Sequence, residues 1–211
     1  MILWEIYHLS WKIMTEQKII NNALHYILYI LDPINHYPYH NINHTLDVYA
    51  RVGYLTDKEQ VFGEDKTDLL IAALFHDTGF TVQYMNNEKI GAQIARTYLL
   101  GIKYKESRIQ KIERLILSTV LFSETHDILE EIIQDADLDN LGRKDCFIKT
   151  LLVRKELNTI AHMNISKRKW LEVSYNLIRT YQYRTVTAKW ERTELKIINT
   201  QKLEEKITHK K

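Results

Sequence analysis

The residues of this chain best suited to chemistry are the pair His76 and Asp77, which follow a strongly apolar run. The segment from Leu69 to Phe75 is hydrophobic on every side, which is typical of a buried helix rather than a surface helix. An ionised carboxylate beside such a run is costly to bury unless it is paired or bound to a cation. The position of Asp77 therefore predicts a positively charged partner, and a metal ion is one candidate.

Two other segments add side chains that bind metals. Upstream the chain reads YHNINHTLDV, with His40 and His44, and downstream it reads DADLDNLGR, with Asp137 at its third position. With His76 and Asp77, one histidine of the upstream segment and one aspartate of the downstream segment give the order H…HD…D, two imidazoles and two carboxylates. This set suits Zn, Mn, Fe or Mg, and the carboxylates favour the harder ions. An aspartate that bridged two such ions would orient a hydroxide for attack on phosphorus. The alternative is a group of buried polar residues that satisfy one another.

Helices must position these residues, because the chain has few of the residues that form turns. Its 211 residues include only six Gly and two Pro, and 45% are hydrophobic, which is enough to build a core. We expect an all-α fold, a single helical bundle spanning residues 17–211 after an N-terminal extension of residues 1–16. The expected helices are the buried run and approximately residues 16–31, 43–55, 88–100, 106–120, 126–135, 144–162, 167–182 and 187 onward.

Local signals mark some of the helix ends. Asp32-Pro33 should end the first helix, since proline disfavours helical geometry in the residue before it. Thr67 or Asp68 is expected to cap the start of the buried helix, and Gly79 to end it.

The composition also restricts location and partners. The single cysteine, Cys146, excludes an intramolecular disulfide and fits a reducing compartment. No stretch approaches the roughly 20 apolar residues that span a bilayer. The start, MILWEIYHLSWKIM, carries charges and lacks a small-residue cleavage site. We expect a cytoplasmic protein with no membrane partner, and Met14 is an alternative start.

Charge is unevenly distributed along the chain. The net charge is only +2, but the residues from Arg143 onward hold 17 Lys and Arg against 7 Asp and Glu. Such asymmetry can mark an anion-binding surface, and the alternative is a solvated helix face with a basic tail. Neither a nucleic-acid motif nor an interleaved aromatic and basic platform is evident, so a nucleic-acid partner is not expected.

In combination, these motifs resemble the HD superfamily of metal phosphohydrolases, which is defined by H…HD…D. More narrowly, the chain resembles bacterial proteins described as predicted metal-dependent HD phosphohydrolases. Their pattern includes YHNxxHTxxV, AALFHDxGF, DADLxxLGR and a C-terminal YxT…K stretch, which here read YHNINHTLDV, AALFHDTGF, DADLDNLGR and YRTVTAKWERTELK. The resemblance runs from about residue 17 to residue 203. Several motifs in the same order are more specific than any one of them.

The resemblance implies a ligand set and a cofactor. His44, His76, Asp77 and Asp137 would hold one or two divalent ions, either Mn, Mg, Fe or Zn. Asp77 would bridge the ions if two bind. The substrates would be small phosphorylated molecules, and nucleotides are the implied class because the wider superfamily usually handles them.

The YHNxxH start is also similar to the catalytic domains of eukaryotic cyclic-nucleotide phosphodiesterases. The first histidine of that motif is their general acid, which implies the same role for His40. The chemistry agrees, because a leaving alkoxide needs a proton and imidazole is a suitable donor near neutral pH. On a helix, His40 and His44 would share one face, so His40 as an additional ligand stays open, as does a surface histidine.

The chain departs from its relatives after the HD pair. Phosphodiesterases carry further histidines there, and the bacterial relatives often show NHE where this chain has Asn86-Asn87-Glu88. If that histidine helps to hold a second ion or the substrate, Asn87 in its place would bind that ion or substrate more weakly. A site with a single ion, or a second ion held mostly by water, is then favoured. Glu88 can still hydrogen-bond a metal-bound water or a ligand histidine.

Other polar residues have open roles. Asn41 is a candidate for substrate binding or for support of a ligand. Arg143 could contact a substrate phosphate, and the alternative is an ion pair, for instance with Glu156. Asp47 could orient a histidine or face solvent. Asp135 and Asp139 are expected to provide a helix cap and a loop hydrogen bond. The C-terminal segment either covers the site or forms a solvated helix, and the residues concerned are Tyr183, Arg184, Lys189 and Lys196.

We therefore expect a metal-dependent phosphohydrolase that cleaves a phosphoester with metal-activated water. Asp77 would orient the nucleophile and His40 would protonate the leaving oxygen. The choice between mono- and diesters and the oligomeric state stay open. The first alternative is a non-catalytic HD-fold protein that binds a nucleotide and regulates a partner. A nuclease, suggested by the basic C-terminal third, ranks lowest.

Overall fold

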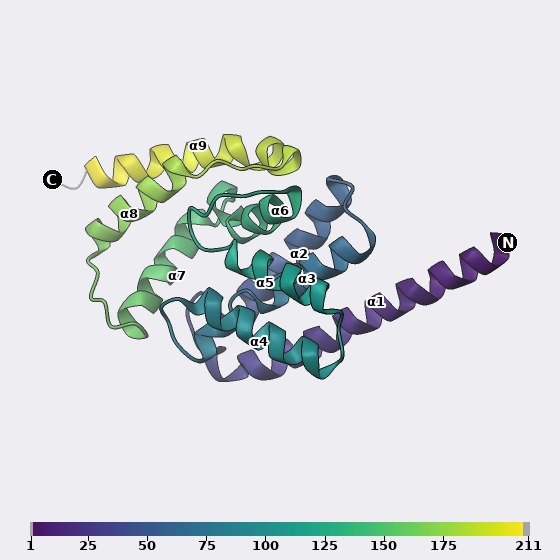
Figure 1. Ribbon diagram of the computed structural model, residues 1–211. Coiled ribbons are helices and arrows are strands. Elements are labelled where there is room, and N and C mark those ends of the chain that lie inside the picture. Colours follow the sequence, from purple (N-terminus) through teal and green to yellow (C-terminus); the bar gives the residue numbers. More distant parts are fainter. Residues whose placement is uncertain (1, 209–211) are drawn as a thin grey trace.

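The computed structural model describes residues 2–208, with side chains described for residues 16–208. In this part of the chain the fold is all-α as expected, with nine α-helices, three short 3-10 helices and no strand (Figure 1). The α-helices are α1 (Ile2–Leu31), α2 (Ile42–Lys58), α3 (Gly63–Phe75), α4 (Asn87–Gly101), α5 (Glu106–Leu117), α6 (Ile128–Asp137), α7 (Cys146–Thr159), α8 (Lys167–Thr180) and α9 (Val186–Thr208). The 3-10 helices are η1 (Asp32–Ile34), η2 (Thr78–Thr81) and η3 (Asp139–Gly142).

Helix α3 lies at the centre of the layer formed by α1–α6 (Figure 1). It contacts α1, α2, α4, α5 and α6, and every residue from Leu69 to Phe75 is at most 7% exposed. Burying seven apolar side chains on all sides of one helix fixes its position, because any shift opens cavities in a densely packed interior. The predicted buried helix is confirmed.

The expected start of α3 is wrong by about one turn. The helix begins at Gly63, so Thr67 and Asp68 lie inside it rather than at its cap. Asp68 is completely buried and accepts hydrogen bonds from Arg108 Nε and the Tyr104 hydroxyl, both at 2.8 Å. A buried carboxylate is tolerated here because α5 and the residues before it supply a cation and a donor.

The expected end of α3 is also displaced. The helix stops at Phe75, His76 takes the C-cap position, and Gly79 lies in η2 instead of ending α3. The helix thus ends at the HD pair itself.

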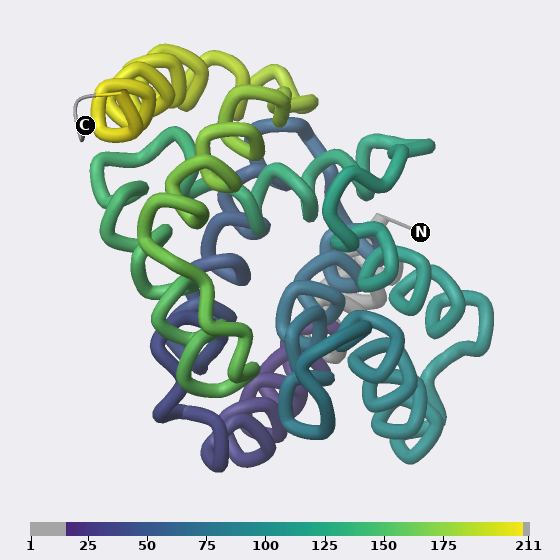
Figure 2. Tube along the Cα trace, turned by 90° about the vertical axis from the view of Figure 1, so that its left-hand side faces the viewer, coloured from purple at the N-terminus to yellow at the C-terminus, as the bar shows by residue number. Residues whose placement is uncertain are grey.

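The last three helices form a second layer beside this core. Helix α7 contacts α8, α8 contacts α9, and α9 contacts η3 and α2. Figure 2 shows α7 and α8 on one side of the molecule, with α4 and α5 on the other side. The ends of α3 and α6 lie between these two sides, which is where a ligand site can form.

Three expectations concern the chain as a whole. The division into an extension of residues 1–16 and a domain from residue 17 stays a prediction; residues 2–16 belong to α1, and the side chains up to residue 15 lie outside the described residues. Within residues 2–208, no helix is both long enough and apolar enough to cross a membrane. Cys146 is a buried free thiol.

Two glycines allow α4 to approach the end of α3 closely. A Cβ atom at Gly79 would overlap the backbone carbonyl of Asn87, the first residue of α4. At Gly91, a Cβ atom would lie 2.9 Å from the carbonyl oxygen of Phe75. Neither carbonyl can move without shifting a helix end, so both positions require glycine.

We predict that Gly79→Ala lowers the free energy of unfolding by about 1–3 kcal/mol, the usual cost of overpacking. The matched control is Gly101→Ala at the other end of α4, where a Cβ atom would meet nothing within 4 Å. It should change stability by less than about 0.5 kcal/mol. Urea denaturation followed by circular dichroism measures both. Equal stability of the two variants would contradict the close approach of η2 and α4.

Candidate metal centre

Three helix ends bring the HD motif residues to one point. His44 lies in the first turn of α2, His76 and Asp77 follow the last residue of α3, and Asp137 is the last residue of α6. Helices α2, α3 and α6 all contact one another, so residues that are far apart in the sequence meet in space.

Asn41 positions His44 through the start of α2. Its side-chain oxygen accepts hydrogen bonds from the backbone N–H groups of Asn43 and His44, at 2.9 and 3.4 Å, and its amide donates to the Tyr37 carbonyl. This is the arrangement of an N-cap residue. The structure thus gives Asn41 a supporting contact with a candidate ligand, and Asn41 does not line the cavity described below.

The His76 ring is oriented by its own helix. Its Nδ1 lies 2.7 Å from the Ala73 carbonyl oxygen, which can only accept, so Nδ1 carries the proton and Nε2 is free as a ligand. A backbone partner on the second ring nitrogen is the usual way in which a protein fixes the tautomer of a metal-binding histidine.

The distances between the four side chains match the edges of a coordination shell. His44 Nε2 lies 3.2 Å from Asp77 Oδ2, 3.2 Å from Asp137 Oδ1 and 3.4 Å from His76 Nε2. His76 Nε2 lies 3.1 Å from Asp77 Oδ2 and 3.7 Å from Asp137 Oδ1. Metal–ligand bonds of about 2.0–2.2 Å give octahedral or tetrahedral edges of about 2.8–3.6 Å. His44, His76 and Asp77, whose ligand atoms all lie within 3.4 Å of one another, therefore fit a divalent ion. Asp137 approaches both imidazoles, and its role as a fourth ligand stays a prediction.

The carboxylates and imidazoles of this cluster also interact strongly with one another. Burial alone would lower the pKa of His44, but Asp137 and Asp77 raise it to about 10. Burial alone would raise the pKa of Asp77, but the imidazoles of His76 and His44 hold it well below its usual value. Asp77 Oδ2 is nevertheless buried without a hydrogen bond of acceptable geometry, although both imidazoles are near. An acceptor that faces two ring nitrogens without bonding to either is placed for a cation between them.

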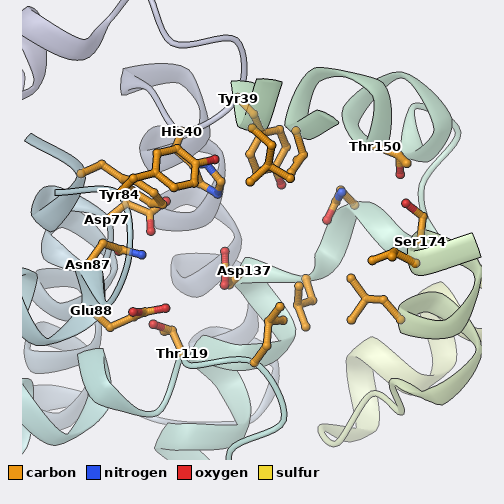
Figure 3. Close-up of a pocket in the computed structure, with 18 of the residues that line it drawn as sticks. Tyr39, His40, Asp77, Tyr84, Asn87, Glu88, Thr119, Asp137, Thr150 and Ser174 are labelled. Carbon is orange, nitrogen blue, oxygen red and sulfur yellow. The ribbon is translucent and has the colours of Figure 1, made fainter. Parts of the chain in front are cut away.

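The cluster forms one end of a cavity of about 360 Å³, within the range of small-molecule sites. Asp77 and Asp137 face this cavity together with His40, as Figure 3 shows. Its far wall is formed by α7 and α8, including Thr150 and Ser174. A ligand in the cavity would thus touch the metal centre at one end and the C-terminal layer at the other.

His40 lies in the loop before α2 rather than on a helix, so the expected shared helical face is wrong. Its ring still meets the His44 ring edge-on, with centroids 5.7 Å apart, and stacks on Phe80 at 4.3 Å. Its Nδ1 lies 2.5 Å from Glu156 Oε1. Because Nδ1 is engaged by that carboxylate, Nε2 is the nitrogen left for a ligand in the cavity.

Glu156 on α7 is the site residue that sequence reasoning assigned to the wrong partner. It is fully buried and accepts hydrogen bonds from the backbone N–H groups of Tyr39 and His40, at 2.7 and 2.9 Å, and from the Tyr84 hydroxyl at 3.0 Å. Burial alone would raise its pKa, but the hydrogen bonds from His40 and the backbone lower it. The carboxylate therefore stays ionised and fixes the His40 ring.

Asn87 and Glu88 lie in the cavity wall beside Asp77, at the start of α4 (Figure 3). Asn87 is 7% exposed, and its side-chain oxygen is buried without a hydrogen-bond partner. Both residues can therefore meet a ligand or a metal-bound water, which keeps their predicted supporting roles open.

Arg143 does not line the cavity, so the structure favours the ion-pair interpretation for it. The partner is not Glu156: Arg143 bonds Asp47 at 2.7 Å and Asp145 at 2.8 Å. Asp47 therefore orients neither histidine, since Arg143 and Lys149 hold it.

Two aspartates beside Asp137 join the C-terminal layer to the core. Asp135 is not a cap of its own helix but a buried residue inside α6 that accepts the backbone N–H groups of Arg184 and Thr185. Asp139 pairs with Arg51 and Arg192, each at 2.7 Å. The contacts of Asp135 fix the backbone between α8 and α9, and the contacts of Asp139 hold α9 and α2 together.

The C-terminal residues that were expected either to cover the site or to lie on a solvated helix have other contacts. Lys196 donates to the carbonyls of Ile178 and Tyr181, Arg184 to the side chain of Gln134, and Tyr183 to the carbonyl of Leu138. None of these three donors lines the cavity, and neither does Lys189. The expected cover over the site is therefore not formed by these side chains.

Comparison with known proteins agrees with this geometry. Residues 41–142 match the HD domain family, so this segment, which contains His44, His76, Asp77 and Asp137, is an HD domain. An uncharacterized protein of Clostridium beijerinckii is 35% identical over 81 residues, which are 37% of this chain and 51% of the relative. The match thus spans about half the length of that relative. No solved structure matches the chain significantly.

We predict that Asp77→Ala abolishes tight binding of Mn²⁺, because it removes the most buried carboxylate of the cluster and leaves two imidazoles facing each other. The matched control is Asp47→Ala, a partly exposed aspartate on α2 that contacts Arg143 instead of the cluster. It should bind Mn²⁺ as the parent does. Isothermal titration with Mn²⁺ and elemental analysis test both variants, with circular dichroism to verify folding. Unchanged Mn²⁺ affinity in Asp77→Ala would refute the assignment.

Proposed function

We propose that this protein is a metal-dependent phosphohydrolase that cleaves a phosphoester of a nucleotide with water. The observation that carries the proposal is the approach of three ligand atoms, from His44, His76 and Asp77, to within 3.1–3.4 Å of one another beside a ligand-sized cavity. Asp137 Oδ1 adds a carboxylate 3.2 Å from His44 Nε2. The HD domain supports the reaction class. The nucleotide, the cytoplasmic location and the number of ions rest on the sequence resemblance and composition.

In this proposal His44, His76, Asp77 and Asp137 hold one or two divalent ions. A bound divalent ion lowers the pKa of water and neutralises charge on the phosphate oxygens. Asp77 faces the cavity and orients the attacking water toward phosphorus. A bond forms between the water oxygen and phosphorus while the ester P–O bond breaks.

His40 supplies the proton that the leaving oxygen needs. Its Nδ1 is held by Glu156, so Nε2 faces the ligand, and the stacked Phe80 ring limits rotation. A positioned acid of this kind typically contributes 10²–10⁴-fold to the rate, more for a poor leaving group than for a good one. Glu156 acts through His40 as a positioning residue.

We predict that Glu156→Gln lowers kcat about 10–100-fold for an alkyl phosphate and much less for p-nitrophenyl phosphate, whose leaving group needs no proton. The amide cannot accept all of the N–H groups that the carboxylate accepts, so the His40 ring loses its orientation. Mn²⁺ content should not change. The matched control is Glu172→Gln on α8, a partly exposed carboxylate that pairs with Arg168 on the surface and does not line the cavity. An equal loss for both substrates would mean that Glu156 has a structural role alone.

A panel of phosphoesters tests the function as a whole. The protein loaded with Mn²⁺ should release product from at least one nucleotide or small phosphoester, and chelation by EDTA should abolish turnover. Asp77→Ala should be inactive on the same substrates. Nucleotide binding without turnover in Mn²⁺, Mg²⁺, Fe²⁺ and Zn²⁺ would favour the non-catalytic regulatory alternative and overturn the hydrolase proposal.

A further inference from the structure

The cavity has an unusual charge distribution for a site that would receive a phosphorylated ligand. Its lining includes the carboxylates of Asp77, Glu88 and Asp137, and among these lining residues there is no lysine or arginine. Figure 3 shows the three carboxylates at one end of the cavity. Among the described residues that line the cavity, His40 is the only side chain that could carry positive charge toward a ligand.

Nearby cations are held away from the cavity. Arg143 and Lys149 pair with Asp47, and Lys196 is bonded to two backbone carbonyls. Moving any of them toward a ligand would break these contacts. The divalent ions of the proposed function are therefore the main source of positive charge for a substrate.

This charge is enough for one phosphate but not for a chain of phosphates. A phosphomonoester carries about −1.5 to −2 at neutral pH. Each further phosphate adds negative charge beside Glu88, and sites for such groups usually supply arginine or lysine. A phosphate group that enters the cavity without a positively charged partner loses its hydration, and this costs free energy.

The opposite wall has a different character. It is largely apolar, with Val153 and Leu157 from α7, Trp170, Val173 and Leu177 from α8, and Leu138 after α6. Its polar members, Asn140, Thr150 and Ser174, are uncharged. An organic group with an apolar face and neutral polar atoms would gain free energy by leaving water here.

We propose, on the basis of the proposed function, that the cavity selects a phosphoester with a single phosphate group on a largely apolar organic group. The phosphate lies at the carboxylate and metal end, and the organic group packs against α7 and α8. Nucleoside monophosphates and aryl phosphates both belong to this class, whereas nucleoside di- and triphosphates do not.

The charge part of the proposal is tested with AMP, ADP and ATP on the protein loaded with Mn²⁺. We expect kcat/KM for AMP to exceed that for ATP at least about tenfold. Equal or higher kcat/KM for ATP would overturn the inference while leaving the hydrolase function intact. No turnover of any of the three would count against nucleotides but would leave the organic part to the binding test below.

The organic part is tested by binding, with two phosphonates that cannot be hydrolysed as esters. By isothermal titration, 1-naphthylmethylphosphonate should bind at least about tenfold more tightly than methylphosphonate. This measurement does not depend on turnover, so it separates failure of this inference from failure of the proposed function. Equal affinity for the two compounds would refute the apolar subsite.

Variants of α8 locate the subsite. Leu177→Ser should reduce the difference in affinity between the two phosphonates several-fold, and so should Val173→Ser at a position that is 41% exposed and tolerant of change. The control is Ile197→Ser on α9, an exposed apolar residue that does not line the cavity. Circular dichroism verifies folding. An undiminished difference in both folded α8 variants would place the organic group elsewhere and overturn the proposal.

Discussion

The arrangement of this molecule depends on one electrostatic constraint, the presence of two carboxylates and two imidazoles at a single, largely buried point. In a medium of low polarity, these groups are stable together only when opposite charges alternate around them. The ring nitrogens of His44 and His76 face the oxygens of Asp77 and Asp137, yet Asp77 Oδ2 has no properly aligned donor. A cation at the centre resolves that conflict, which is why the cluster is better explained as a ligand set than as mutual satisfaction of buried polar residues.

Such a centre requires that its ligands lie on helices that are fixed relative to one another. Helix α3 meets this requirement through its complete burial, and its last turn fixes His76 through the Ala73 carbonyl. The close approach of α4 at Gly79 then places Asn87 and Glu88 beside Asp77. On the other side, Asp135 binds the backbone before α9, so the end of α6 that carries Asp137 is tied to the C-terminal layer.

What the sequence predicted, and what it did not, follows from the range of the interactions. The helices and the buried run could be predicted because each depends on a local pattern. The four site residues were predicted from the resemblance of several ordered motifs to a known family. The start of α3 was misplaced because Asp68 resembles a cap, whereas its donors come from Arg108 and Tyr104, far along the chain. Glu156 was paired with Arg143 on charge alone, since no local signal shows that an α7 carboxylate meets His40 across 116 positions. Pairings that depend on how helix layers pack leave no such pattern.

The same packing explains why the basic C-terminal third does not make the cavity basic. Its excess of lysine and arginine suggests an anion-binding surface, but several of these cations, including Arg143, Lys149, Arg192 and Lys196, are bonded to Asp47, Asp139 and backbone carbonyls. They join helix layers and leave the cavity acidic and apolar. A divalent ion is then both the group that the buried carboxylates require and the main positive charge that a phosphate would meet. Selectivity for the charge of a substrate and the electrostatic stability of the cluster would therefore depend on the same four side chains.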